Sequence, residues 1–467
     1  MKPGYVSIRF IIVATIFLAG CTVGPNYKRP KVDTPSVYRS VDQLPSNQNG
    51  PSLGNEKWWT VFQDPQLQEL IRAALAGNYD VRIAATRVLQ AEALLGITRA
   101  DQYPTISASA AGLNQRIPQT VTFPSTNTGA ISAGLSLAWE LDFWGKFRRA
   151  TEASRANLLA TEWGQRAVIT SLISNVATAY FQLRELDLEM EISKQTLAAR
   201  QESLRLVKVR AQGGVTSLID VRQSEELVYF AAASIPDLER RIEQQENFIS
   251  ILTGSNPGPI ARGRTLVETS IPATVPAGLP SDILERRPDV QSAEYSLVAA
   301  NARIGVARAA YFPQIVLTGS GGFQSSALTN LFSTSAGFWS AGAQLAQPLF
   351  AGGRIRSGVR LSESQEQEAV LFYQQTIQQA FREVADALVA YKKDQEFREQ
   401  QELLTKAAED ATALSNVRYR GGAASYLEVL DSDTRYFSAR LGLAQAQLNE
   451  RVALVQVYNA LGGGWEQ

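Results

Sequence analysis

The residues best placed to do chemistry are three carboxylates, Glu428, Asp431 and Asp433, in the stretch Tyr426–Asp433. Close carboxylates can form a glycosidase pair, hold a cation or line a gate. On a helix, Glu428 and Asp431 share one face with Arg435, whereas Asp433 points elsewhere. We therefore interpret Asp433 as a solvated surface charge. For the other two, an exposed helix face with an Asp431–Arg435 pair is the alternative to a functional site.

Composition removes several classes of function. The 467 residues contain 45 Lys+Arg against 45 Asp+Glu, so the basic excess of a nucleic-acid binder is missing. There is no histidine, which excludes Ser-His and Cys-His catalysis and imidazole-bound zinc. With two methionines and one cysteine, soft-metal ligation has almost no ligands. We expect no metal site and no cofactor.

The N-terminus carries a targeting segment. Lys2 and Arg9 accompany the apolar run Phe10–Leu18, which has signal-peptide length. Leu-Ala-Gly-Cys, ending at Cys21, resembles a bacterial lipobox, so we predict cleavage after residue 20 and lipidation of Cys21. A signal peptide with a chance cysteine is the alternative. Thr22 favours the outer membrane, by analogy with bacterial lipoproteins. After this segment the sequence contains no run of 18 consecutive apolar residues, so no membrane-spanning helix is predicted.

The chain is two copies of one unit. Tyr79–Pro104 matches Pro288–Pro313 at a shift of 209 residues, and Val209–Gly214 matches Val417–Gly422 at 208. A near-constant shift indicates that a whole structural unit was duplicated. The predicted organisation is a signal peptide, a lipidated N-terminal segment, repeat 1, a Pro-rich linker, repeat 2 and a tail, at residues 1–20, 21–63, 64–254, 255–280, 281–463 and 464–467.

Each repeat opens with a helix. Asp64-Pro65 is a good N-cap followed by proline at the first helical position, and Asp282–Glu285 has capping-box spacing. The opening helices are expected to end near Pro104 and Pro313.

A β-hairpin follows in each repeat, giving four strands. The clearest signal is the alternation of apolar with small or polar residues from Ile131 to Phe143, with weaker alternation from Ile106, Ile315 and Trp339. Aromatic residues gather at one end of the strands, as in a membrane-interface belt. The core of a soluble sandwich is the alternative. These aromatic residues are Tyr103, Phe143, Trp144, Tyr311, Phe312 and Phe350.

Very long helices complete each repeat, from about 145 to 212 and from about 353 to 420, roughly 100 Å each. Glycine turns and return helices at 218–252 and 426–461 follow. A heptad seam runs along the first long helix. The turn glycines are Gly213, Gly214, Gly421 and Gly422, and the seam residues are Leu172, Val176, Ala179, Leu183, Leu186 and Met190.

Four strands cannot enclose a lumen, because eight are about the minimum for a barrel. An open sheet in lipid would leave its edges unpaired. Several chains must therefore pool their strands, and three would give twelve. The fold class predicted is mainly α with a membrane β-barrel shared by a trimer, and with long coiled-coil helices projecting into the periplasm.

Five stretches of the chain resemble the TolC-type outer-membrane efflux proteins, in their NodT-like lipoprotein branch. The resemblance implies a homotrimer with a twelve-stranded barrel and a twelve-helix tunnel. It also implies an exit duct in the outer-membrane lipid that meets a periplasmic adaptor and an inner-membrane transporter, expected to be of the RND type. Because the transporter would supply the energy, the resemblance implies no catalytic residue in this chain. The stretches are Cys21–Tyr27, Trp58-Trp59, Gly278–Asp289, Tyr426–Asp431 and Asn459–Trp465.

The same resemblance assigns a periplasmic gate. Glu428 and Asp431 fall where acidic residues line the constriction, and threefold symmetry would make them a ring of six. Asp220, the repeat-mate of Glu428, matches an aspartate that bonds to a tyrosine on the neighbouring hairpin, and Tyr419 matches that tyrosine. Heptad packing is the alternative role for Tyr419.

This chain departs from the family pattern at two gate positions. A basic residue used by some members for a second link is Ala424 here. An arginine that others carry three residues after the aspartate is replaced by Thr434, with Arg435 shifted by one. Metal-ion efflux, type I secretion, a stand-alone porin and a carbohydrate-acting enzyme are the competing functions, and the transported substrate cannot be read from the sequence.

Overall fold

The computed structural model describes residues 22–35, 38, 52–118, 125–268 and 275–465. Cys21 and the predicted signal peptide lie outside these residues. The chain divides into two compact units. The strand unit comprises residues 1–31, 87–161 and 292–373, and the helix unit comprises residues 32–86, 162–291 and 374–467. Within the described residues, no helix combines the length and apolarity needed to cross a bilayer.

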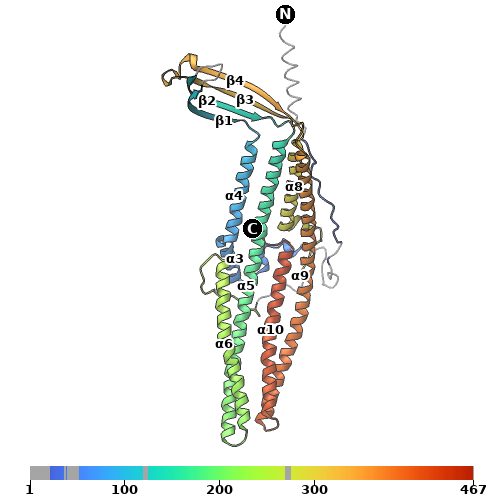
Figure 1. Cartoon of the computed structure of the whole chain (residues 1–467). Coiled ribbons are helices and arrows are strands. Elements are labelled where there is room, and N and C mark those ends of the chain that lie inside the picture. The colour runs from blue at the N-terminus through green and yellow to red at the C-terminus, as the bar shows by residue number, and fades with distance from the viewer. Residues whose placement is uncertain (1–21, 36–37, 39–51, 119–124, 269–274, 466–467) are drawn as a thin grey trace. The chain divides into compact units, whose positions relative to one another are not determined.

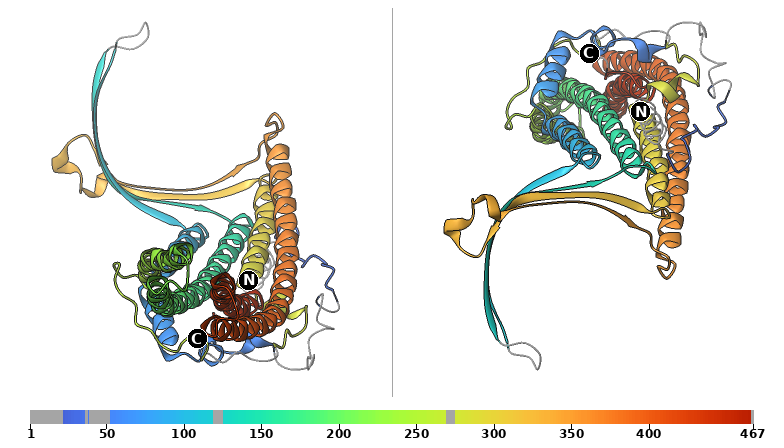
Figure 2. Two further views of the ribbon diagram at one scale, coloured as in Figure 1. Left: turned by 90° about the horizontal axis from the view of Figure 1, so that it is seen from below. Right: turned by 90° about the horizontal axis from the view of Figure 1, so that it is seen from above.

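The strand unit contains one antiparallel sheet in the order β1-β2-β3-β4 (Figure 1). Each repeat supplies one hairpin, as predicted, and β2 pairs with β3 to join the two hairpins. The sheet is strongly curved, which is clearest in Figure 2. Among the described elements, β1 and β4 have a strand neighbour on one side only. The strands are β1 (Thr105–Ile117), β2 (Thr126–Glu140), β3 (Gln314–Ser325) and β4 (Gly337–Ala346).

The strand predicted to run to Phe143 ends earlier, at Glu140. The reason is Asp142, whose carboxylate accepts hydrogen bonds from the backbone N–H groups of Phe147 (3.1 Å) and Arg148 (2.9 Å). These N–H groups belong to the first turn of the next helix, where they have no intrahelical partner. Asp142 therefore prepares a helix start, although its place in the alternation suggested a strand.

An N-terminal strap, residues 22–29, is fastened to the strand unit. Val23 N–H donates to the carbonyl of Trp144 at 3.1 Å. The buried Arg149 guanidinium donates to the carbonyl of Val23 (3.3 Å) and to the side chain of Asn26 (2.7 Å). Farther along, the carboxylate of Glu294 accepts a hydrogen bond from Tyr27 and pairs with Arg29. The strap is thus held at both of its ends.

The opening helix of each repeat is split in two, into α3 (Pro65–Gly77) with α4 (Tyr79–Ala100), and α7 (Asp282–Arg286) with α8 (Pro288–Ala309). The Asp64 cap is confirmed, because its carboxylate accepts from the first backbone N–H groups of α3. The predicted capping box at Asp282–Glu285 is wrong. Ser281 at the N-cap is already in the helical region, with φ −63° and ψ −29°, so its hydroxyl makes no cap bond.

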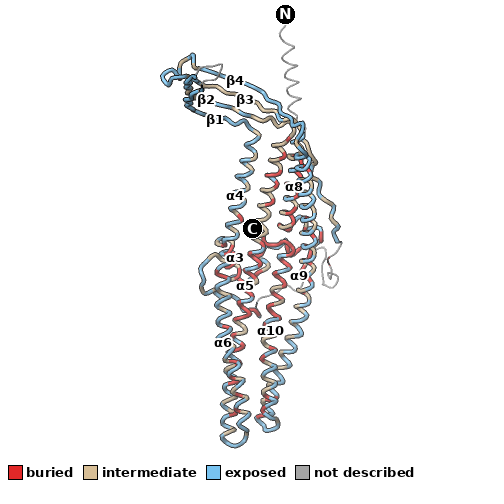
Figure 3. Tube along the Cα trace, in the orientation of Figure 1, coloured by how far each residue is buried: buried red, intermediate tan, exposed pale blue. Residues whose placement is uncertain are grey.

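The four long helices match the predicted bounds to within a residue. The outgoing helices α5 (Lys146–Gln212) and α9 (Arg354–Arg420) have 67 residues each, and the return helices α6 (Leu218–Leu252) and α10 (Tyr426–Ala460) have 35 each. The predicted heptad seam of α5 is confirmed, since all six of its residues are buried. In Figure 3, buried positions recur along the helices of the helix unit between intermediate and exposed ones.

Asp64 also ties together three segments of the helix unit. Besides capping α3, its carboxylate accepts from the Tyr180 hydroxyl of α5 at 2.8 Å and from the Arg264 backbone N–H at 3.1 Å. The same hydroxyl accepts from the Gly263 N–H at 3.0 Å. Asp64 and Tyr180 are both almost fully buried, at 1 % and 0 % exposure.

Short helical turns complete the described structure. They are η2 (Leu53–Asn55), α2 (Trp58–Val61), η3 (Leu328–Asn330) and η4 (Thr334–Ala336).

Candidate functional site at the hairpin turns

The glycine pairs turn the chain at the ends of α5 and α9, as predicted. Gly214 and Gly422 have φ of +70° and +74°, the left-handed region that glycine adopts without penalty. Each turn is a Schellman motif. In the first, Gly214 N–H donates to the Ala211 carbonyl at 3.0 Å and Val215 N–H to the Arg210 carbonyl at 2.9 Å, and the second repeats both bonds.

Asp220 closes the first hairpin by capping α6. Its Oδ2 accepts hydrogen bonds from the Thr216 hydroxyl and from the Ser217 backbone N–H and hydroxyl, while the Ser217 hydroxyl accepts from the Asp220 N–H. This is a complete capping box. Partial burial alone would raise the pKa of Asp220, but the hydrogen bonds from Thr216 and Ser217 outweigh it and lower that pKa.

Tyr419 packs between the two hairpins. Its ring lies 5.4 Å from that of Tyr426, and the Arg210 guanidinium lies 4.5 Å from its centroid. It belongs to a buried cluster with Val207, Val221 and others. Its hydroxyl has no hydrogen-bond partner among the described residues. Within one chain, therefore, the structure shows the packing role, and the Asp220–Tyr419 bond is not formed.

Glu428 and Asp431 each pair with an arginine near the second turn. Glu428 Oε1 lies 3.1 Å from Arg418 Nε, and Asp431 Oδ2 lies 2.9 Å from Arg435 Nε. The Asp431–Arg435 pair is the one expected from helical spacing. Both carboxylates are well exposed, at 43 % and 58 %, so these surface pairs contribute little stability and leave the carboxylates accessible.

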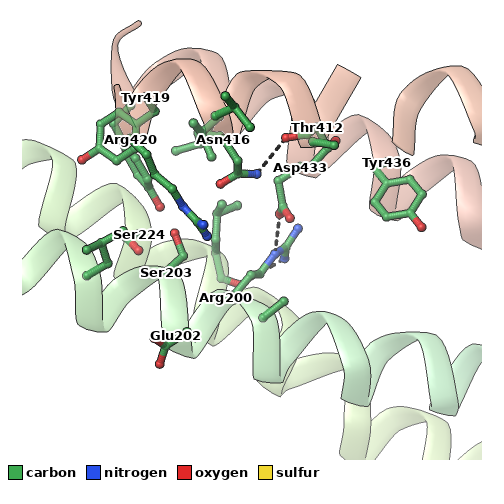
Figure 4. A pocket seen from close by; sticks show the side chains of 18 of the residues that line it. Arg200, Glu202, Ser203, Ser224, Thr412, Asn416, Tyr419, Arg420, Asp433 and Tyr436 are labelled. Carbon is green, nitrogen blue, oxygen red and sulfur yellow. Dashed lines mark hydrogen bonds and ion pairs between the residues drawn. The ribbon is translucent and has the colours of Figure 1, made fainter. Parts of the chain in front are cut away.

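The interpretation of Asp433 as a solvated charge is wrong. Asp433 Oδ2 accepts from Arg200 Nε of α5 at 2.8 Å, and the two side chains are 22 % and 3 % exposed (Figure 4). The partners are 233 residues apart in the chain. A local pattern carries no signal for such a contact, because the helical face of Asp433 is readable from sequence but its neighbour on another hairpin is not.

A cavity of about 930 Å³ lies between the hairpins beside this ion pair. Both hairpins line it, with polar side chains that include Arg200, Ser224 and Tyr436 (Figure 4). No pattern in the sequence indicated this cavity. No group of three or more His, Cys, Asp or Glu side chains in the described part of the chain is arranged to hold a metal ion.

Comparison with known proteins decides the family. Residues 70–255 and 279–463 match the family described as outer membrane efflux protein. The chain belongs to this family. Two similar relatives are the solvent efflux pump outer membrane protein SrpC of Pseudomonas putida, 38 % identical over 97 % of both chains, and the cation efflux system protein CusC of Escherichia coli, 35 % identical over 96 % of this chain and 97 % of that one.

Solved structures agree with this assignment. The outer-membrane channel OprN superimposes with a TM-score of 0.89 at 31 % identity, over 96 % of this chain and 100 % of that chain. The chain is thus an outer-membrane component of an efflux system, and OprN, which it resembles in structure, is an outer-membrane channel.

Proposed function

We propose that three copies of this chain form a gated exit duct that passively carries small molecules from an inner-membrane transporter, bridged by a periplasmic adaptor, across the outer membrane. The observation that carries the proposal is the sheet of four strands whose edge strands, β1 and β4, are each paired on one side only. Unpaired strand edges are not tolerated in lipid. Three chains joined edge to edge would pair every strand in a closed barrel of twelve.

The proposed gate uses the exposed carboxylates of Glu428 and Asp431. Threefold symmetry would turn each pair into a ring of six, which attracts cations and resists passage while the turns are close together. Their arginine partners, Arg418 and Arg435, are themselves more than half exposed, so the pairs can be exchanged for other contacts.

The tyrosine link of the gate also remains a proposal. All three hydrogen bonds that Asp220 accepts go to Oδ2, and within the described residues Oδ1 accepts none. The Tyr419 hydroxyl likewise has no partner there. A donor from the neighbouring hairpin of the assembly could therefore reach Oδ1 without breaking the capping box. The link would replace the one that Ala424 and Thr434 cannot make.

Single-channel recording in planar bilayers tests the gate. Replacing Glu428 and Asp431 together by alanine should raise the conductance and weaken block by divalent cations, because the ring of charge is removed. A matched control is Glu409→Ala with Asp410→Ala, an exposed acidic pair on α9 that faces Lys406. Conductance and cation block that stay unchanged in the first variant, or change equally in the control, would refute the gate.

We further propose that Cys21 is lipidated and that the strap carries the anchor. The support is the position of Thr22, the next residue, which packs so closely on Gly145 that a Cβ there would lie 2.9 Å from the threonine methyl. Gly145 follows Trp144, whose ring stacks on Phe312 at 4.6 Å in the predicted interface belt. Labelled palmitate should be incorporated into the native chain and not into Cys21→Ser; equal incorporation would contradict lipidation.

For the cargo we propose small organic molecules, following the solvent-efflux relative. For the transporter we propose the RND type, which the family resemblance implies. The cation-efflux relative supplies the alternative. Deletion of the gene should increase susceptibility to hydrophobic drugs and solvents; increased susceptibility to metal cations alone would favour metal-ion efflux.

A further inference from the structure

Arg200 stands where three helices of the helix unit meet. From α5 its Nε donates to Asp433 of α10 at 2.8 Å, and its Nη1 donates to the Leu227 carbonyl of α6 at 3.0 Å. Its guanidinium also lies 5.1 Å from the ring centroid of Phe437 on α10. The side chain is only 3 % exposed. Arg200 of the first hairpin therefore contacts two residues of the second hairpin, Asp433 and Phe437.

The surrounding packing between the hairpins is discontinuous. Toward the turns, the cluster that contains Val207 and Tyr419 spans both hairpins. On the other side, Ile192 packs with Phe437 and Ala444. The cavity of about 930 Å³ interrupts this packing, and Arg200 and Asp433 line its wall (Figure 4). The ion pair therefore lies beside a gap in the packing between two apolar contacts.

The Arg200–Asp433 ion pair is costly to break, yet the hydrogen bonding of Arg200 is incomplete. A buried guanidinium that lost its carboxylate would be left as an uncompensated charge, which is costly in a low-dielectric site. Yet Arg200 Nη2 has no hydrogen-bond partner within the described structure. A buried polar network that is only partly satisfied contributes little net stability. Such a contact favours one arrangement of the hairpins without locking it permanently.

We propose that Arg200 and Asp433 form a latch that keeps the two helical hairpins of one chain together, and that its release lets them separate when the turns open. The inference rests on the proposed duct for its role in gating. It differs from the carboxylate ring, because the latch acts inside one chain and is buried, whereas Glu428 and Asp431 are exposed.

Cysteine labelling at the cavity tests the latch directly. Ser224 lines the cavity and is 1 % exposed, so a maleimide reaches Ser224→Cys only when the hairpins part. The only native cysteine is Cys21. In the assembled, membrane-inserted protein, Asp433→Asn should speed labelling of Ser224→Cys about tenfold. Asp433→Glu retains the charge and should keep labelling slow.

The matched control is Asp237→Asn, which breaks an exposed ion pair with Arg240 inside the first hairpin. It should leave the labelling rate unchanged. Equal labelling in native and Asp433→Asn backgrounds, or equally fast labelling in Asp433→Glu, would overturn the latch. Heat-stable trimers in every variant would show that the label reports hairpin separation in folded protein; labelling that rises only because trimers are lost would also overturn it.

Conductance separates the latch from the proposed duct. Asp433→Asn should raise the open fraction of the channel several-fold. If the Glu428/Asp431 variant raises conductance and Asp433→Asn does not, the latch has no part in gating and the proposal fails. If neither variant changes conductance, the proposed gate fails, and the labelling rate alone decides whether the latch holds the hairpins.

Discussion

Asp64 makes the sharpest prediction for stability, because one buried carboxylate serves four donors. Its Oδ1 accepts from Gln66 N–H at 2.8 Å and Leu67 N–H at 3.4 Å, and its Oδ2 accepts from Tyr180 and Arg264. Asp64→Ala removes a helix cap, which costs about 1 kcal/mol. It also leaves one buried donor, the Tyr180 hydroxyl, unpaired, at roughly 1–3 kcal/mol. The Arg264 N–H belongs to an exposed residue, so its loss should cost little. The sum is about 2–4 kcal/mol.

The expected shift in melting temperature follows from chain size. Unfolding entropy is about 2.1 cal/mol/K per residue, so 467 residues give about 1 kcal/mol/K and the variant should melt roughly 2–4 °C lower. Asp64→Asn keeps the capping oxygen and should lose about half as much. Tyr180→Phe removes one donor to Asp64 and the acceptor of Gly263, so it should cost roughly 1–3 kcal/mol.

Thermal unfolding of the detergent-purified protein, followed by circular dichroism, measures these shifts. Asp80→Ala is the matched control, because Asp80 is an exposed aspartate in the first turn of α4. It should shift the melting temperature by less than about 0.5 °C. A shift below 1 °C for Asp64→Ala, or an equal loss in Asp64→Asn and Asp64→Ala, would show that the four bonds are not what holds this junction.

Two further predictions concern stability. Burial, reinforced by the neighbouring carboxylate of Glu189, raises the pKa of Glu185 to about 8. Between pH 4.5 and pH 8 the folded chain therefore holds a proton that the unfolded chain has released. The free energy of unfolding should fall as pH rises through this range. Glu185→Gln should match the native melting temperature at pH 5 and exceed it at pH 8.5; equal pH profiles would contradict the assignment. Gly254→Ala should lower the melting temperature far more than Gly214→Ala. Both glycines have positive φ, but only at Gly254 would the new Cβ meet a backbone oxygen, that of Gly77 at 2.2 Å. Equal decreases in melting temperature would refute this reasoning.

Local signals predicted the elements well, and contacts between distant elements escaped prediction. The glycine turns and the limits of the four long helices follow from periodicity and backbone preferences that act within a few residues. The strand ending at Glu140 was overextended because Asp142 fits an alternating strand as well as a helix start. The box predicted at Asp282–Glu285 failed because spacing does not reveal the backbone angles of Ser281.

The candidate site shows the same division. Helical spacing was sufficient for the Asp431–Arg435 pair, whose members are four residues apart. It could not reveal that Asp433 meets Arg200, or that a cavity separates the hairpins there, because both depend on how two remote helices pack. The family resemblance supplied the proposed gate positions, but it did not reveal that Asp220 caps α6.

The two turns differ in a way that affects how the helices fray. Ser425 and Glu428 have the spacing of a capping box, like Ser217 and Asp220, yet Ser425 makes no side-chain cap bond and Glu428 faces Arg418. The first backbone amides of α10 therefore lack the side-chain acceptor that protects those of α6, and they should exchange with deuterium sooner. Glu428 also has an alternative partner to Arg418, because a capping box with Ser425 would let its carboxylate accept a hydrogen bond from the Ser425 backbone N–H. Because the N-terminal end of α10 should fray before that of α6, we expect the second hairpin to move first when the turns open.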